Sequence, residues 1–251
     1  MRFRPNLWLG LALLGLVGVG LRCATAPYTG RRQLILLAEA EERRLGEEAY
    51  RELLQQKRLS RDPRKVAWVR RVGERIARAA HRPDYRWAFA VIEDDHTVNA
   101  FCLPGGKIAV YTGILPLARD DAGLATVLAH EVAHALLRHG AERMSTGFVA
   151  ELVRLGLLRA TGAYRDPEKR RALSLAYGVG VGVGMMLPFS RTQELEADRV
   201  GLLLMARAGY DPREALAFWE RMMRHNRGAQ VPEFLSTHPS DQHRLEALRR
   251  Y

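Results

Sequence analysis

The chain has 251 residues, enough to bury the core of one large domain or of two small ones. It carries 39 Lys and Arg residues against 28 Asp and Glu residues, which gives a formal net charge of +11. The basic residues are spread along predicted helices, and no nucleic-acid-binding motif accompanies them. The composition therefore argues against a nucleic-acid partner and fits some affinity for anionic membrane surfaces.

Residues 1–22 have the pattern of a targeting segment. Arg2 and Arg4 precede an unbroken apolar run over residues 7–21, which is shorter than the about 20 residues of a spanning helix and typical of a signal peptide. Cys23 follows at the position of the lipidated cysteine in bacterial lipoproteins, although Arg22 stands where such signals normally have a small residue. We expect an exported, membrane-associated protein of the cell envelope, held by a lipid on Cys23 or, alternatively, by an uncleaved N-terminal anchor.

Two amphipathic helices are predicted next. The first spans residues 39–57, and Asp62 and Pro63 form an N-cap and N1 pair that opens the second, which runs to about residue 80. The apolar face of the first is predicted at Leu45, Ala49, Leu53 and Leu54. Neither helix carries candidate chemistry, so both are expected to cover the core.

A small β-sheet is predicted between these helices and the middle of the chain. Residues 85–93 alternate apolar and polar side chains, as a half-buried strand does. Residues 98–103 and 107–112 flank Pro104, Gly105 and Gly106, which predicts a β-hairpin. A strand at an open sheet edge can pair with an extended peptide through main-chain hydrogen bonds.

An H-E-x-x-H motif lies at His130, Glu131 and His134. On a helix, positions i and i+4 share one face, so the two imidazoles can bind one Zn²⁺ at about 2.0–2.1 Å. Glu131 is then placed to act as the general base. Asp120 predicts the start of this helix, and Gly140 suits the C′ position at its end.

A zinc hydrolase needs a third protein ligand and one open position. The longer H-E-x-x-H-x-x-G-x-x-H form is not present, because Leu137 stands where its Gly should be and Gly140 stands where its last His should be. His139 is one residue off and, on a continuous helix, points away from the zinc-binding face. We therefore expect His139 to be structural or solvated.

A later helix offers a carboxylate as the third ligand. Glu194 and Asp198 are four residues apart and share a face. Glu194 is predicted to bind the metal, and Asp198 to hydrogen-bond the far nitrogen of a ligating His, which orients that ring. Glu196 is expected to point elsewhere.

Residues 144–161 are predicted to form a further helix, and residues 172–189 form an uncharged run with alternating glycines. This run is interpreted as a flexible, apolar lid, with a second membrane contact as the alternative. His238 and Arg244, six residues apart near the C-terminus, are predicted to supply an electrophile that stabilises the oxyanion near the zinc. Neutral imidazole is also a good fourth zinc ligand, so His238 is alternatively a group that closes the site at rest.

Three motifs together resemble the HtpX/CAAX-prenyl-protease-type family of gluzincin zinc metallopeptidases, most closely its soluble, exported members: H-E-V-A-H at 130–134, P-F-S-R-T-Q-E-L-E-A-D-R-V-G at 188–201 and S-T-H-P-S-D-Q-H-R-L at 236–245. The resemblance extends from about residue 23 to the C-terminus. It implies an α+β, mostly α-helical gluzincin domain over residues 23–251, with a small sheet beside the zinc-binding helix and one Zn²⁺ per chain. It also implies that His238 and Arg244 lie at the active site, and that the strand beginning Asn99, Ala100 and Phe101 binds substrate.

The sequence thus predicts a zinc-dependent metalloendopeptidase that acts on protein and peptide substrates, cleaving misfolded or stalled envelope proteins. The alternative is an envelope chaperone or assembly factor whose zinc site is largely latent. A complete ligand set of His130, His134 and Glu194 with Glu131 beside it disfavours a purely structural site, because structural zinc sites are closed by four protein ligands. The sequence does not specify an oligomeric state.

Overall fold

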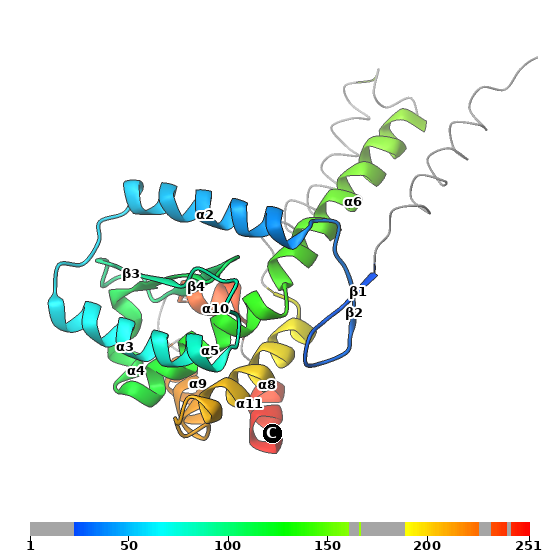
Figure 1. Cartoon of the computed structure of the whole chain (residues 1–251). Coiled ribbons are helices and arrows are strands. Elements are labelled where there is room, and N and C mark those ends of the chain that lie inside the picture. Colours follow the sequence, from blue (N-terminus) through cyan, green and yellow to red (C-terminus); the bar gives the residue numbers. More distant parts are fainter. Residues whose placement is uncertain (1–22, 161–165, 167–188, 226–231, 240–241) are drawn as a thin grey trace, which may run out of the picture.

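The computed structural model describes residues 23–160, 166, 189–225, 232–239 and 242–251. The predicted leader at 1–22 and most of the predicted lid, residues 172–188, lie outside the described residues. Helices dominate the described part, and they pack around a three-stranded sheet (Figure 1). This arrangement confirms the prediction of an α+β, mostly α-helical fold.

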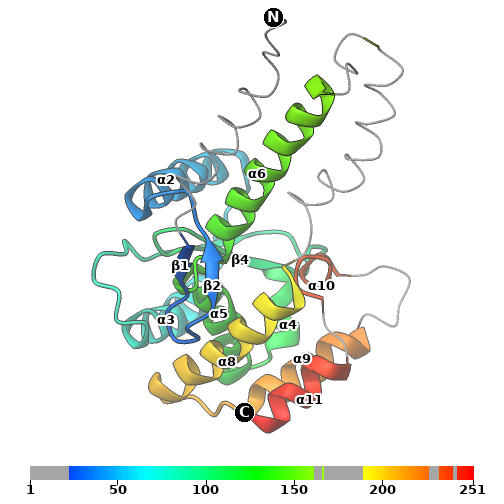
Figure 2. The same cartoon turned by 90° about the vertical axis from the view of Figure 1, so that its right-hand side faces the viewer.

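Helix α5 (Asp121–Leu136) carries the H-E-x-x-H motif and lies at the centre of the fold, buried along almost its whole length. Its N-cap is Asp120, as predicted, whose carboxylate accepts hydrogen bonds from the N–H groups of Ala122 and Gly123 at 3.0 Å each. Helix α8 (Arg191–Arg207) packs along α5 (Figure 2). The two backbones approach closely at Gly201, where a Cβ atom would lie 3.4 Å from the His130 Cα atom.

The predicted end of the zinc-binding helix is wrong. Gly140 does not follow α5, which already ends at Leu136, and the left-handed residue after its C-cap is Arg138, with φ of 56°. The Arg138 side chain is held there by an ion pair with Glu42 and a 2.9 Å hydrogen bond to the Leu37 carbonyl. Helix α6 (His139–Ala160) starts immediately afterwards, so the predicted helix at 144–161 begins earlier and includes Gly140.

The central sheet contains β3 (Ala88–Ile92), β4 (Ala100–Leu103) and β5 (Lys107–Tyr111) in the order β3-β5-β4. Strands β4 and β5 form the predicted antiparallel hairpin, and β3 runs parallel to β5. Both β3 and β4 therefore lie at an edge. A second, two-stranded sheet joins β1 (Cys23–Thr25) to β2 (Arg32–Leu34).

Helices α2 (Glu39–Gln56) and α3 (Pro63–Ala79) flank the sheet, and Asp62 caps α3 as predicted. The predicted apolar face of α2 is only partly right: Leu53 packs against the core, but Ala49 is exposed. The residues that α2 buries fully are Glu42, Gly46 and Tyr50. Gly46 permits a close crossing over the hairpin, since a Cβ atom there would lie 2.1 Å from the Pro104 carbonyl oxygen. This contact, which no helical pattern encodes, sets the orientation of α2.

The remaining elements complete the core around α5. A 3-10 turn η1 (Thr112–Ile114) and α4 (Leu115–Ala118) lead from the sheet into α5. Helices α9 (Glu214–His225), α10 (Glu233–Thr237) and α11 (Gln242–Arg250) close the other side, where Trp219 and Phe234 are buried. Leu203 on α8 is exposed. Among the described helices, none combines the length and apolar character needed to span a bilayer.

Candidate active site

Four side chains converge on one buried point. They are the two histidines of α5, Glu194 of α8 and His238 at the end of α10, and their ligand atoms all lie within 4.8 Å of one another. The spacing of α5 puts the Nε2 atoms of His130 and His134 3.1 Å apart. The Glu194 Oε1 atom lies 3.3 Å from His134 Nε2 and 3.0 Å from His238 Nδ1.

This donor set fits zinc. Ligands at about 2.0–2.1 Å in a tetrahedron lie about 3.3 Å from each other. The separations of 3.0–3.3 Å between neighbouring donor atoms of His130, His134, Glu194 and His238 match that value. Three imidazole nitrogens and one carboxylate are also a ligand combination that zinc prefers. The structure therefore groups the three predicted ligands and adds His238 in the fourth direction.

Glu131 lies beside this group without belonging to it. Its Oε1 atom is 3.4 Å from His238 Nε2, and within the described part of the chain that oxygen has no hydrogen-bond partner. Burial raises the pKa of Glu131 above the ordinary value of a glutamate. The backbone of Cys102 on β4 hydrogen-bonds to the same carboxylate, which places the edge strand next to this acid.

Asp198 and Arg244 contact the candidate ligands from behind. The Asp198 Oδ1 atom lies 3.0 Å from His130 Nδ1, the geometry predicted from the sequence. Arg244 contacts both carboxylates, with Nη1 2.6 Å from Glu194 and Nε 2.5 Å from Asp198, and its guanidinium lies over the Trp219 ring. In this arrangement the Arg244 charge is directed at the metal-site carboxylates.

The charges around the site keep the Glu194 and Asp198 carboxylates ionised. Burial raises the pKa of Glu194 and of Asp198, but the Arg244 charge and the nearby histidines outweigh it, so both pKa values lie below their ordinary range. Burial lowers the pKa of His134 well below its ordinary value. Burial also lowers the pKa of His130, but the Glu194 and Asp198 carboxylates outweigh that effect and raise it to about 9.

His139 is structural, as one of its two predicted readings has it, but the predicted directions of His139 and Glu196 are wrong, because both point toward the site. His139 is fully buried, with Nδ1 2.9 Å from His134 Nδ1 and Nε2 3.1 Å from the Glu196 carboxylate. Thr29 and Arg31, from the turn between β1 and β2, hydrogen-bond to Glu196 at 2.7 and 2.9 Å. Both residues therefore belong to the support of His134. The left-handed turn before His139 returns its ring to the site, which a continuous-helix wheel misses.

The predicted substrate strand lies at the sheet edge beside the site. Tyr111 donates to the Asn99 carbonyl at 3.0 Å. The backbone N–H and C=O groups of Asn99 and Phe101 therefore point toward β5, and those of Ala100 point away from it, to the open edge. The outward Ala100 N–H is held by the Asn99 side chain at 2.8 Å. Phe189, the last residue of the predicted lid, stacks on the His134 ring with centroids 3.9 Å apart.

The fold and this site define a gluzincin-type metallopeptidase: H-E-x-x-H on one helix, with a carboxylate from a second helix beside it. The sequence profile of Peptidase family M48 matches residues 63–251, and the chain belongs to this family. The membership confirms the family resemblance predicted from the motifs, and zinc is the metal that the donor set fits.

The chain is similar to several metallopeptidases. It is 35% identical to the Mitochondrial metalloendopeptidase OMA1 of Schizosaccharomyces pombe, over 90% of this chain and 65% of that protein. It is 35% identical to the human mitochondrial Metalloendopeptidase OMA1, over 98% of this chain and 50% of that protein. It is 29% identical to the Beta-barrel assembly-enhancing protease of Escherichia coli, over 90% of this chain and 46% of that protein. The chain thus spans about half the length of most relatives it matches.

Proposed function

We propose that this chain is a zinc-dependent metalloendopeptidase of the cell envelope that cleaves misfolded or stalled proteins. The observation that carries the proposal is the convergence of His130, His134 and Glu194 on one buried point, with the Glu131 carboxylate beside it. The names of the OMA1 relatives and of the Escherichia coli protease support the same reaction class.

Each residue of the site has a separate role in the proposed peptide hydrolysis. Zinc, when bound, polarises the scissile carbonyl and lowers the pKa of the attacking water. Glu131, whose Oε1 atom lacks a hydrogen-bond donor among the described residues, takes the proton from that water and passes it to the leaving amine. Asp198 and His139 orient the rings of His130 and His134. The substrate backbone pairs with the outward edge at Ala100, after Asn99 releases it.

His238 favours a second candidate function. Its Nδ1 atom lies 3.3 Å from His130 Nε2 and 3.0 Å from Glu194, in the position of a fourth ligand. A site closed by four protein ligands cannot activate water. The position of His238 therefore favours, as the alternative function, an envelope chaperone or assembly factor with a largely latent zinc site.

The deciding experiment is cleavage of casein by the purified mature chain, with and without a chelator, beside Glu131→Gln. The proposal expects cleavage that the chelator abolishes, and a Glu131→Gln variant that keeps zinc in elemental analysis but loses turnover. His134→Ala is expected to lose zinc, whereas His243→Ala, which alters an exposed histidine, is the matched control. A Glu131→Gln variant that cleaves at the parent rate would refute the role of the base. Absence of cleavage by a zinc-loaded parent would favour the latent site.

The envelope location is part of the proposal and has its own test. A lipid on Cys23 after removal of residues 1–22 would hold the domain at a membrane surface, and mass spectrometry of the native N-terminus measures it. An intact Met1, or a cut elsewhere than before Cys23, would refute lipidation and favour the uncleaved anchor.

A further inference from the structure

The central sheet has a second edge, at β3, on the side opposite the strand that borders the active site. Of the residues that the structure describes, those before α3 cover only the second half of this edge. Ser60 donates to the Val91 carbonyl at 2.8 Å, and Leu59 forms an antiparallel bridge with Ile92. The chain then turns into α3, so among the described residues no strand continues along the edge at Phe89.

The backbone groups of Phe89 point out from the sheet. Ala88 donates to the Gly106 carbonyl at 3.0 Å, which turns Ala88 toward β5, whereas Val91 faces outward to Ser60. Successive residues of a strand alternate in direction, so Phe89, two residues before Val91, faces outward as well. An edge with outward N–H and C=O groups is a template for pairing with another strand.

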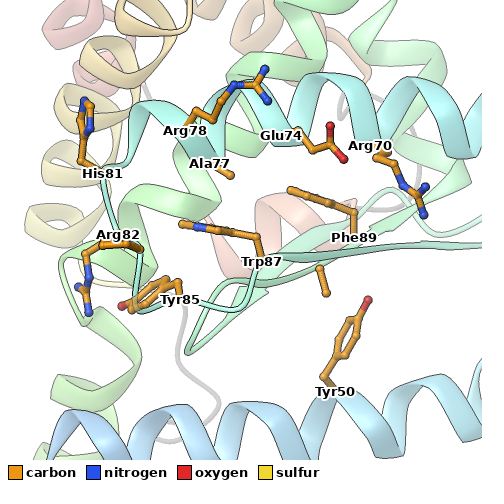
Figure 3. A pocket seen from close by; sticks show the side chains of 12 residues that line it. Tyr50, Arg70, Glu74, Ala77, Arg78, His81, Arg82, Tyr85, Trp87 and Phe89 are labelled. Atoms are coloured by element: carbon orange, nitrogen blue, oxygen red, sulfur yellow. The ribbon is translucent and has the colours of Figure 1, made fainter.

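A hollow of about 1040 Å³ opens at this part of the edge, between α2 and α3. Figure 3 shows Trp87 and Phe89 beside the strand, with Tyr50 reaching toward it from α2 on one side and α3 running alongside on the other. Aromatic side chains line the floor: Tyr50, Tyr85, Trp87 and Phe89. Such a surface accommodates apolar side chains of an added strand.

The α3 wall of the hollow has an alternating charge pattern. Arg70, Glu74 and Arg78 are exposed and four residues apart, and in the described part of the chain none of them forms an ion pair. The two arginines are eight residues apart, which is about 12 Å along a helix. Residues i and i+4 of an extended chain lie on one face about 13 Å apart. A strand lying along the edge can therefore place acidic side chains opposite both arginines and a basic one opposite Glu74.

We propose that the β3 edge binds an extended segment of a partner protein by strand addition, with the pattern acidic–x–basic–x–acidic facing α3 and apolar residues facing Tyr50. A second copy of this chain does not fit, because it would bring the same unpaired arginines together in a protein of net charge +11. The site lies at the opposite sheet edge from β4, so it does not depend on zinc or on the proposed peptidase activity.

Fluorescence polarisation with a labelled peptide Asp-Val-Lys-Val-Asp tests this proposal on the full chain carrying Glu131→Gln, which prevents cleavage. We expect binding that a chelator leaves unchanged. The double variant Arg70→Ala, Arg78→Ala is expected to weaken binding by about tenfold or more, since two charge-assisted contacts are lost. Arg64→Ala, an exposed arginine on α3 outside the hollow, is the matched control.

Two peptide series make the test specific. Reversing the charges to Lys-Val-Asp-Val-Lys is expected to abolish binding. Methylating alternate backbone nitrogens in two complementary sets is expected to abolish binding for one set only, because only every second amide of a paired strand faces its partner. Hydrogen exchange is expected to slow at Phe89. The proposal would be overturned if both methylated sets lost binding or if neither did. It would also be overturned if the reversed peptide or a single-stranded oligonucleotide bound equally well, or if the peptide did not bind at about 1 mM.

Discussion

Replacing Arg244 with Met tests whether the buried guanidinium holds the metal-site carboxylates in place. Arg244 is 3% exposed and lies 2.6 Å from Glu194 and 2.5 Å from Asp198, with its guanidinium 3.8 Å from the centre of the Trp219 ring. Met keeps much of the aliphatic length but removes the charge. The variant therefore leaves two buried carboxylates without their cation.

The loss of stability in Arg244→Met follows from this geometry. Removing one partner of a buried ion pair destabilises a protein by about 3–5 kcal/mol. In a chain of this size each kcal/mol lowers the melting temperature by about 2–4 °C, so we expect Arg244→Met to lower it by about 6–20 °C. Thermal and urea unfolding of the chelated protein measure the change. Added zinc should restore part of the stability, because the ion places positive charge beside Glu194.

The control lies on the same helix. Arg249 pairs with Glu220 at the surface, and Arg249→Met is expected to change the unfolding free energy by no more than about 0.5 kcal/mol. If Arg244→Met unfolds within about 1 kcal/mol of the parent and binds zinc equally well while turnover alone falls, the supporting role is wrong. In that case Arg244 acts on the reacting oxyanion, as predicted from the sequence.

Three further predictions concern other parts of the site and core. His238→Ala is expected to raise basal casein cleavage by removing the fourth donor, and a decrease on the order of 10²-fold would instead assign His238 to oxyanion stabilisation. Glu196→Gln is expected to weaken zinc binding by about tenfold in chelator competition, since it removes the negative charge of the group that accepts from His139. Unchanged affinity would contradict that support. Burial raises the pKa of Tyr85 to about 12. The neutral phenol therefore contributes stability that is fully present below the unfolded pKa of about 10 and is lost as the pH rises to 12. Tyr85→Phe should remove that part of the alkaline decrease in the free energy of unfolding, measured with urea.

Local rules determined the parts of the site that lie within one element. The four-residue spacing of His130 and His134 already places both rings on one face, whatever surrounds the helix. The caps at Asp62 and Asp120 and the β4–β5 hairpin also depend on neighbours in the chain, and the structure has each of them where it was predicted. Their physical basis is short-range hydrogen bonding and turn geometry, which the sequence carries directly.

Contacts between distant segments decided the rest. Arg138 adopts a left-handed conformation through its contacts with Glu42 and Leu37, and that turn brings His139 against His134, where a helical wheel would have pointed it away. The buried face of α2 and the parallel pairing of β3 with β5 likewise arise from elements far apart in the chain. A sequence pattern specifies which residues share a face, but the direction of that face depends on the packing of all the elements together, which only the tertiary structure shows.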